Sequence, residues 1–205
     1  MSAVMKTNRE GANRRLRVAV GAAVAFGMAV ALAVAGKQPV VEGGRVDFRL
    51  PDLLGRVVSS ADPQFAGKVL LVDLWATWCP PCITEIPTLI DLQEQYGDSG
   101  LVIVAIAFEA EEQQEERHAR LREFVAQQGI NYLVLDGGRP EDFEVALPSV
   151  KNVRGFPVEI LVDRSGRVTA ARNGYGFKKK WAAKLEREIG ALVSPSTSSN
   201  RPAPR

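Results

Sequence analysis

Residues 69–82, VLLVDLWATWCPPC, decide how this chain folds. The nearly continuous apolar run of residues 69–75 predicts a central β-strand that is covered on both faces. Cys79 and Cys82 are the only cysteines in the chain. On the first turn of a helix, their spacing would bring the two Cβ atoms to about 5–6 Å, close enough for a disulfide. The two prolines between them suit a helix start, where their missing N–H groups are not needed. The stretch therefore predicts a strand, a short turn and a helix that begins at the cysteines.

The cysteine pair is the clearest candidate for chemistry, and the predicted helix start favours a redox role. A helix N-terminus favours negative charge, so we expect Cys79 to have the lower pKa and to be the more nucleophilic sulfur. A zinc site needs about four ligands, and His118 is the only histidine. A c-type haem would need a histidine directly after Cys82, where the sequence has Ile83. A copper-carrying module with two thiolates stays open as an alternative. For the redox dithiol we expect no metal and no cofactor.

The charges of the chain are unevenly distributed, which bears on its partners. The chain has 26 basic and 24 acidic residues, but residues 1–36 hold five of the basic residues and one of the acidic residues. The remaining body, with 21 basic and 23 acidic residues, is close to neutral and slightly acidic. Because this body has no basic stripe, the sequence argues against nucleic acid as a partner.

The first 36 residues have the pattern of a membrane-targeting segment. Residues 1–17 are polar and basic, and residues 18–35 form an uncharged run that is rich in Ala, Val and Gly. This run is slightly short for a membrane anchor, which needs about 20 apolar residues, and slightly long for a secretory signal peptide. In both cases the basic cluster predicts an N-terminus on the cytoplasmic side of the membrane and a body on its outer side. We favour the anchor, with a cleaved signal peptide as the alternative.

The rest of the chain alternates strands and helices. The predicted order is hairpin, strand, helix, strand, helix, strand, short helical piece, hairpin and helix, over residues 46–58, 69–75, 79–96, 101–108, 109–129, 131–136, 141–147, 158–170 and 178–192. Strand–helix–strand units predict parallel central strands with helices on both faces, and the second hairpin adds antiparallel strands. Pro87 predicts a kink in its helix rather than an end. We expect the charge-rich helix of residues 109–129, which contains His118, to be solvated.

Two stretches resemble sequences of the thioredoxin fold. They are residues 69–82 and the run GFPVEILVDRSGRV at residues 155–168. More narrowly, the chain resembles the membrane-tethered thiol-disulfide oxidoreductases of the TlpA/ResA/CcmG-like group. The N-terminal hairpin of that group is similar to DFRLPDLLGRVV at residues 47–58. The resemblance covers residues 46–189 and implies a thioredoxin-like α/β fold. This fold has a central mixed sheet flanked by helices, an N-terminal β-hairpin and a central βα insertion.

The resemblance also implies roles for individual residues. Cys79 would be the attacking thiol and Cys82 the resolving thiol of a redox disulfide. Pro157 would be a cis-proline that faces the disulfide, and the backbone of Phe156 would offer hydrogen bonds to an extended substrate peptide. Trp78 resembles the exposed aromatic residue that the group has beside its nucleophile. The expected substrate-binding residues are Trp78, Pro80, Pro81, Phe156 and Pro157.

Two acidic residues are candidates for the group that takes the proton of the resolving thiol. Asp73 matches the buried acid beneath the resolving cysteine of thioredoxin, and Glu85 matches an acid of the ResA-like group. A buried carboxyl has a raised pKa and can act as a base, so Asp73 and Glu85 are both candidate catalytic residues, and the choice between them stays open. Glu159 departs from the relatives. It is either a solvent-facing strand residue or a charge near the substrate that tunes the choice of partner.

These observations predict an extracytoplasmic thiol-disulfide oxidoreductase that reduces the disulfides of partner proteins. The resemblance implies apocytochrome c or copper-site proteins as its substrates, and a transmembrane electron donor that reduces it again. A copper-delivery module and a dithiol oxidase of folding proteins are the alternatives. The expected segments are a cytoplasmic basic segment, a membrane anchor or signal peptide, a linker, the thioredoxin-like domain and a disordered tail, at residues 1–17, 18–36, 37–45, 46–192 and 193–205.

Overall fold

The computed structural model describes residues 38–173 and 178–194. The predicted basic segment of residues 1–17 and the predicted membrane segment of residues 18–36 lie outside the described residues, as does the tail from residue 195 onward. Within the two described ranges, no helix is both long enough and apolar enough to cross a membrane.

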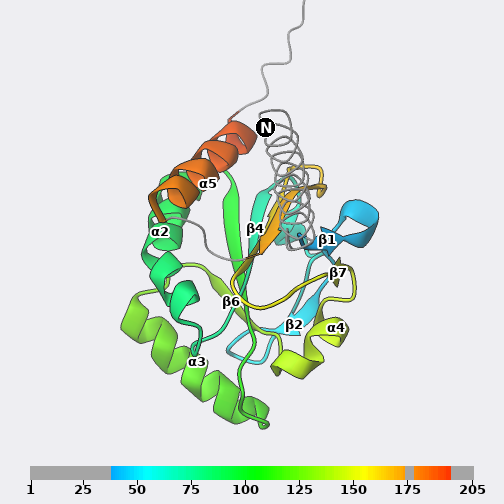
Figure 1. The fold of residues 1–205 in the computed structure, drawn as a ribbon, viewed down its shortest axis with the longest axis vertical. Coiled ribbons are helices and arrows are strands. Elements are labelled where there is room, and N and C mark those ends of the chain that lie inside the picture. Colours follow the sequence, from blue (N-terminus) through cyan, green and yellow to red (C-terminus); the bar gives the residue numbers. More distant parts are fainter. Residues whose placement is uncertain (1–37, 174–177, 195–205) are drawn as a thin grey trace, which may run out of the picture. The chain divides into compact units, whose positions relative to one another are not determined.

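The predicted central strand is β4 (Val69–Trp75), and all seven of its residues are buried. It lies in the middle of a five-stranded sheet with the order β6-β5-β4-β8-β9 (Figure 1). On one side β4 pairs in parallel with β5 (Leu101–Ala107), which pairs in parallel with β6 (Leu133–Asp136). On the other side β4 pairs antiparallel with β8 (Val158–Val162), which pairs antiparallel with β9 (Val168–Asn173). The predicted mixed sheet is therefore confirmed.

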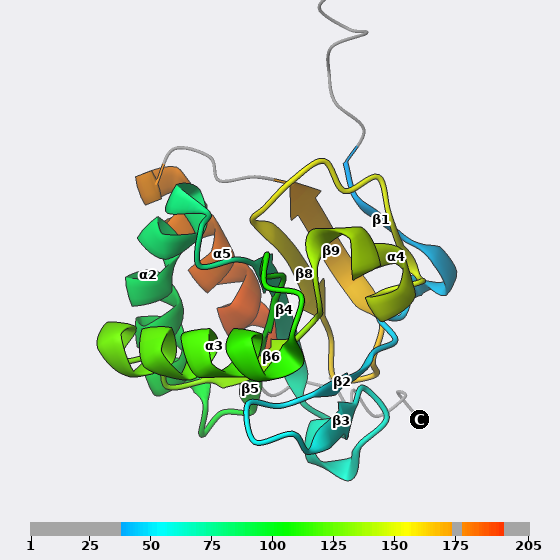
Figure 2. The same cartoon turned by 90° about the horizontal axis from the view of Figure 1, so that it is seen from below.

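Three long helices cover one face of this sheet (Figure 2): α2 (Pro80–Tyr96), α3 (Gln114–Gln128) and α5 (Lys178–Val193). The helices α2 and α3 each connect neighbouring parallel strands, and both connections step across the sheet in the same direction. Right-handed connections that step in one direction place their helices on one face. The prediction of helices on both faces is therefore right only in part, because the only α-helix packed on the opposite face, among the described residues, is the short α4 (Phe143–Ala146).

The N-terminal hairpin covers most of that opposite face. It consists of β2 (Arg49–Pro51) and β3 (Val57–Ser59), which pair antiparallel as predicted, and the 3-10 helix η2 (Pro63–Phe65) follows it. The 3-10 helix η3 (Pro140–Asp142) leads directly into α4. Apolar side chains of the hairpin and α4 pack with alternate residues of β4. The central strand is thus buried on both faces, which explains its nearly continuous apolar sequence.

The predicted linker of residues 37–45 contains structure of its own. The strand β1 (Val40–Val41) pairs antiparallel with β7 (Val150–Lys151), and neither strand was predicted. The 3-10 helix η1 (Glu42–Gly44) follows β1. A two-residue strand is too short to leave a periodic signal in a sequence, so only its partner in the folded chain reveals it.

The charge-rich helix also differs from its prediction. α3 begins at Gln114 rather than at residue 109. Arg117 and His118 are buried, at 3.0 and 3.2 Å from the carboxylate of Asp136 at the end of β6. The prediction that this charge run is solvated is therefore wrong for these two residues. A buried carboxylate needs charged or hydrogen-bonding partners, and Arg117 of α3 supplies both to Asp136.

Candidate active site

The two cysteines are joined at the start of α2. The Cys79–Cys82 disulfide has an S–S distance of 2.04 Å and a Cα–Cα distance of 5.3 Å. Cys79 is the N-cap residue, and its Sγ accepts a hydrogen bond from the Cys82 N–H at 3.3 Å. The helix starts with Pro80 and Pro81 and continues through Pro87, as predicted. In the reduced protein, the free N–H groups of a helix start stabilise a thiolate at the N-cap more than one further along the helix.

Little of either cysteine reaches the surface. Cys79 is 4% exposed and Cys82 is 3% exposed. The side chains that flank them are exposed instead: Pro80, Pro81 and Trp78, of which Trp78 is 47% exposed. A partner that approaches the sulfurs therefore meets these three side chains first.

The loop that leads into β8 lies next to the cysteine loop. The Phe156–Pro157 peptide bond is cis, as the resemblance implies. The ring of Phe156 lies 6.0 Å from that of Trp78 and stacks on Phe108 at 5.3 Å between ring centroids. The Trp78 Nε1–H also donates a hydrogen bond to the carbonyl oxygen of Phe108 at 3.1 Å. These contacts bring together two predicted substrate-binding segments that are far apart in the sequence, and their role in binding stays a prediction.

A groove of about 530 Å³ runs beside these aromatic rings. Trp78, Phe143 and Phe156 line it, and Glu144 and Lys151 add charged groups to its wall. A groove that combines apolar rings with a few charged groups suits an extended peptide better than a small charged ligand.

The loop before Cys79 is held by residues that the sequence analysis missed. Glu109 is fully buried, and its carboxylate accepts hydrogen bonds from the Thr77 N–H at 2.7 Å and the Thr77 hydroxyl at 2.8 Å. The Arg120 Nε–H donates to the same hydroxyl oxygen at 2.8 Å and lies 3.4 Å from the Glu109 carboxylate. Burial raises the pKa of Glu109, while the Thr77 hydrogen bonds and the Arg120 charge oppose that rise. The sequence feature that could have revealed a buried role for Glu109 is its position directly after the apolar run of residues 101–108.

Replacing Thr77 with valine is expected to loosen this loop. The change keeps the shape of the side chain, but it leaves Glu109 and Arg120 each without one hydrogen-bond partner. Loss of a partner from a buried polar group costs about 1–3 kcal/mol, so we expect the free energy of unfolding, measured in denaturant, to fall by that amount. Thr84→Val is the matched control, because the exposed Thr84 hydroxyl bonds only the Pro80 carbonyl among the described residues. Equal stability of the two variants would contradict the role given to Thr77.

Asp73 and Glu85 are both buried, at 4% and 1% exposure. Glu85 lies on the buried side of α2, three residues after Cys82, and residues at that spacing share a helix face. One oxygen of Asp73 (Oδ1) and both carboxyl oxygens of Glu85 have no hydrogen-bond partner among the described residues. Burial, followed by the charges of Asp73 and Glu159, raises the pKa of Glu85 to about 10. Burial and the Glu159 charge raise the pKa of Asp73 well above its ordinary value.

Glu159 is 2% exposed, so the interpretation of a solvent-facing residue is wrong, and the interpretation of a charge that tunes the choice of partner stays a prediction. Glu159 lies directly opposite Asp73 in the β4–β8 pairing, so the two side chains point to the same face of the sheet. The Trp181 Nε1–H donates to Glu159 Oε1 at 2.6 Å. Burial raises the pKa of Glu159 to about 7, against the charge of Arg172. The missed signal was the otherwise apolar sequence of β8, VEILV, which is typical of a strand covered on both faces.

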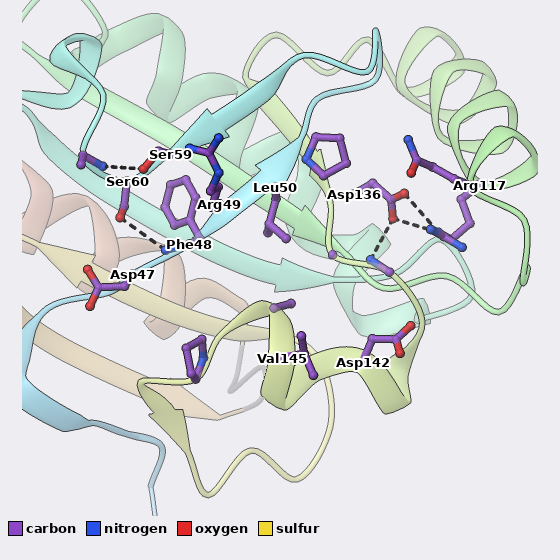
Figure 3. Close-up of a pocket in the computed structure, with 17 residues that line it drawn as sticks. Asp47, Phe48, Arg49, Leu50, Ser59, Ser60, Arg117, Asp136, Asp142 and Val145 are labelled. Carbon is purple, nitrogen blue, oxygen red and sulfur yellow. Dashed lines mark hydrogen bonds and ion pairs between the residues drawn. The ribbon is translucent and has the colours of Figure 1, made fainter.

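A second hollow, of about 580 Å³, lies between the N-terminal hairpin and α4 (Figure 3). Arg49 of β2 and Val145 of α4 line it, and Arg117 contacts both carboxylate oxygens of Asp136 in its wall, at 3.0 and 3.1 Å. None of its lining residues belongs to the cysteine site. Among the described residues, no group of three or more His, Cys, Asp or Glu side chains is arranged to hold a metal ion.

Comparisons with known proteins also point to thiol–disulfide chemistry. The model of the Redoxin family matches residues 42–185. The thioredoxin-like protein YneN of Bacillus subtilis is 30% identical over 140 residues, which cover 68% of this chain and 75% of YneN. The thiol-disulfide oxidoreductase ResA of Bacillus thuringiensis is 26% identical over 142 residues, 69% of this chain and 74% of ResA. A crystal structure of a thiol:disulfide interchange protein from Chlorobium tepidum matches with a TM-score of 0.58 at 25% identity, over 78% of this chain and 99% of that protein.

Proposed function

This chain belongs to the redoxin family and is a thiol-disulfide oxidoreductase of the ResA/DsbE type, and from that premise we propose that it reduces disulfides of partner proteins outside the cytoplasm. One observation supports the proposal most. The Cys79–Cys82 pair lies at a helix start, between an exposed Trp78 and the buried carboxyl of Glu85 on the same helix. One side of the pair can meet a partner, and the other side can take a proton.

The reaction would begin at the reduced Cys79. Its thiolate attacks one sulfur of the partner's disulfide, the partner's S–S bond breaks, and one partner sulfur leaves as a thiolate. The product is a mixed disulfide between Cys79 and the partner. The groove beside Trp78 and Phe156 would hold the partner's chain in an extended conformation during this step.

Cys82 would then release the partner. Its thiol gives a proton to the carboxylate of Asp73 or Glu85, and the resulting thiolate attacks Cys79 Sγ. The mixed disulfide breaks, the Cys79–Cys82 disulfide forms, and the second partner sulfur leaves as a thiolate. Two electrons have then passed from the enzyme's dithiol to the partner. A dithiol of a transmembrane electron donor would return the enzyme to its reduced form.

The proposed location and partners rest on the N-terminal sequence and on the family resemblance. The basic residues 1–17 and the apolar residues 18–36 would tether the domain to the outer side of the cell membrane. The proposed substrates are the cysteine pairs of apocytochrome c or of copper-site proteins. Apocytochrome c attaches its haem covalently through two cysteine thiols, and a copper-site protein binds its metal through thiolates, so both need their cysteines reduced.

The reduction potential of the Cys79–Cys82 couple tests the direction of the reaction. A reductase must give electrons to its partners, so we expect a value of about −270 mV, near that of thioredoxin. The measurement equilibrates the protein with thiol–disulfide buffers and traps the free thiols with an alkylating reagent. A variant with serine at both Cys79 and Cys82 is the control and should take up no reagent.

Two results would reject the reductase proposal. A potential of about −120 mV would indicate a dithiol oxidase. Tight binding of Cu(I) by the two thiolates, together with a negligible rate of insulin disulfide reduction, would indicate a copper-delivery module instead.

A further inference from the structure

Three buried carboxyl groups from three different elements meet on one face of the sheet. Asp73 comes from β4, Glu85 from α2 and Glu159 from β8, and each is at least 96% buried. Asp73 and Glu159 are direct neighbours across the β4–β8 pairing, which puts their Cβ atoms at about 4.5–5.5 Å. Like charges this close in a dry environment cannot all form at neutral pH, so the cluster must hold protons.

The three carboxyls differ in what surrounds them. Glu159 accepts a hydrogen bond from the Trp181 indole at 2.6 Å and lies 3.4 Å from the Arg172 guanidinium. Arg172 in turn contacts the partly exposed Glu188 at 2.6 Å. Asp73 Oδ1, both oxygens of Glu85 and Glu159 Oε2 have no hydrogen-bond partner among the described residues, but of these oxygens only Glu159 Oε2 has a cation at 3.4 Å. Donors and cations stabilise a carboxylate, so the negative charge of the cluster resides first on Glu159.

We propose that Glu159 is a positioning residue of the redox reaction, and that its charge sets the pH at which Asp73 or Glu85 can take the proton of Cys82. A negative charge on Glu159 repels a second negative charge on Asp73 or Glu85. These two carboxyls therefore stay protonated to a higher pH than they would beside a neutral residue. The raised pKa values of Asp73 and Glu85, both of which include a contribution from the Glu159 charge, agree with this coupling. The inference rests on the proposed order of attack, in which Cys82 is the resolving thiol.

Other titratable groups face the cluster from the elements packed around it. Tyr132, just before β6, lies close enough to Asp73 and Glu85 that burial and their two charges raise its pKa. It is therefore neutral throughout the range in which the carboxyls titrate. The charged groups that act on Glu159 are those of β9 and α5, namely Arg172, Lys184 and Glu188. Since Glu188 and Lys184 are 30% and 57% exposed, water screens both of them, and Arg172 is the main cation on Glu159.

Glu159→Gln tests the proposal, because the amide keeps the hydrogen-bond acceptor for Trp181 and removes the charge. The assay mixes reduced protein with an aromatic disulfide that releases a coloured thiolate. Attack by Cys79 releases the first thiolate, and attack by Cys82 releases the second. We expect the midpoint of the pH profile of the second phase to move down by roughly one pH unit in the variant, while the profile of the first phase stays unchanged.

Three further variants separate the charge effect from loss of structure. Glu159→Leu also removes the charge, and it serves if the glutamine variant does not fold. Glu159→Asp keeps the charge and should leave the midpoint near that of the natural protein. Glu186→Gln removes an exposed carboxyl from the same helix as Trp181 and should change nothing. A second phase that slows equally at every pH, with an unmoved midpoint in Glu159→Gln and Glu159→Leu, would overturn the proposal and reduce Glu159 to a structural residue.

Cys82→Ser distinguishes failure of this inference from failure of the proposed function. If Cys79 attacks first, this variant keeps the first phase at the rate of the natural protein and loses the second phase. If the first phase slows in Cys82→Ser but keeps its rate in Cys79→Ser, Cys82 attacks first, and both proposals fall. If Cys82→Ser keeps the first phase but Glu159→Gln shows no shift of the second, the role of Glu159 alone is overturned.

Discussion

Replacing Cys79 with serine is expected to lower the rate of disulfide reduction by at least about a thousandfold, because a serine hydroxyl does not ionise near neutral pH and cannot attack a disulfide. Replacing Cys82 with serine should have a different result. The first attack proceeds, but no second thiol resolves it, so a mixed disulfide between Cys79 and the partner accumulates. The first effect is measured as insulin reduction, and the second as a covalent adduct on a non-reducing gel.

The two variants are matched controls for each other. Both remove one sulfur atom from the same buried disulfide, so both lose the same cross-link from the oxidised protein. A difference between them therefore reports the roles of the two sulfurs rather than their effect on stability. Adducts that form through Cys82 in Cys79→Ser, or no adducts in Cys82→Ser, would contradict the proposed order of attack.

Replacing Glu85 with glutamine is expected to stabilise the oxidised protein at alkaline pH. The carboxyl has a pKa of 4.5 in the unfolded chain and of about 10 in the folded chain. Between these two values the folded chain holds one proton more than the unfolded chain, so the free energy of unfolding falls as the pH rises. Glutamine does not titrate, so the Glu85→Gln variant does not show this fall in the free energy of unfolding. We expect the gain in the free energy of unfolding to be roughly 4 kcal/mol larger at pH 8 than at pH 5.

Denaturant unfolding of the oxidised protein at several pH values measures this gain. Asp91→Asn is the control, because Asp91 is an exposed carboxyl on the same helix and its removal should change the free energy of unfolding by less than about 0.5 kcal/mol. The prediction fails if Glu85→Gln and the natural protein lose stability in parallel between pH 5 and pH 8. The same variant is expected to resolve mixed disulfides more slowly if Glu85, rather than Asp73, takes the proton of Cys82.

Sequence patterns were enough to predict the parts of the site that depend on local rules. The strand β4, the helix start at Cys79 and the continuation of α2 through Pro87 follow from neighbours along the chain. An apolar run, a proline with its fixed φ and a spacing of three residues on a helix act over one or two turns. The substrate-binding roles of Phe156 and Pro157 came only from the family resemblance, because nothing local connects these residues to the cysteines.

These patterns could not predict which charged residues are buried or which groups contact them. For Glu159, within β8, the sequence predicts either a solvent-facing residue or a charge near the substrate, whereas both faces of β8 are covered. His118 was read as solvated, although the end of β6 covers it. In both cases a segment distant in the sequence supplies the covering atoms, and the cost or gain of burying a charge depends on those atoms.

A redox-active cysteine pair at the start of a helix that follows a buried strand could be predicted from consecutive residues alone. Apolar periodicity and proline geometry are properties of consecutive residues, and they carry this information without a fold. By contrast, the contacts of Glu159 with Asp73 and Glu85, and of Glu109 with Thr77, exist only in the folded chain. Strand pairing and helix packing create these contacts, and the electrostatic energy of a carboxyl is set by the groups within a few ångströms of it, wherever they lie in the chain.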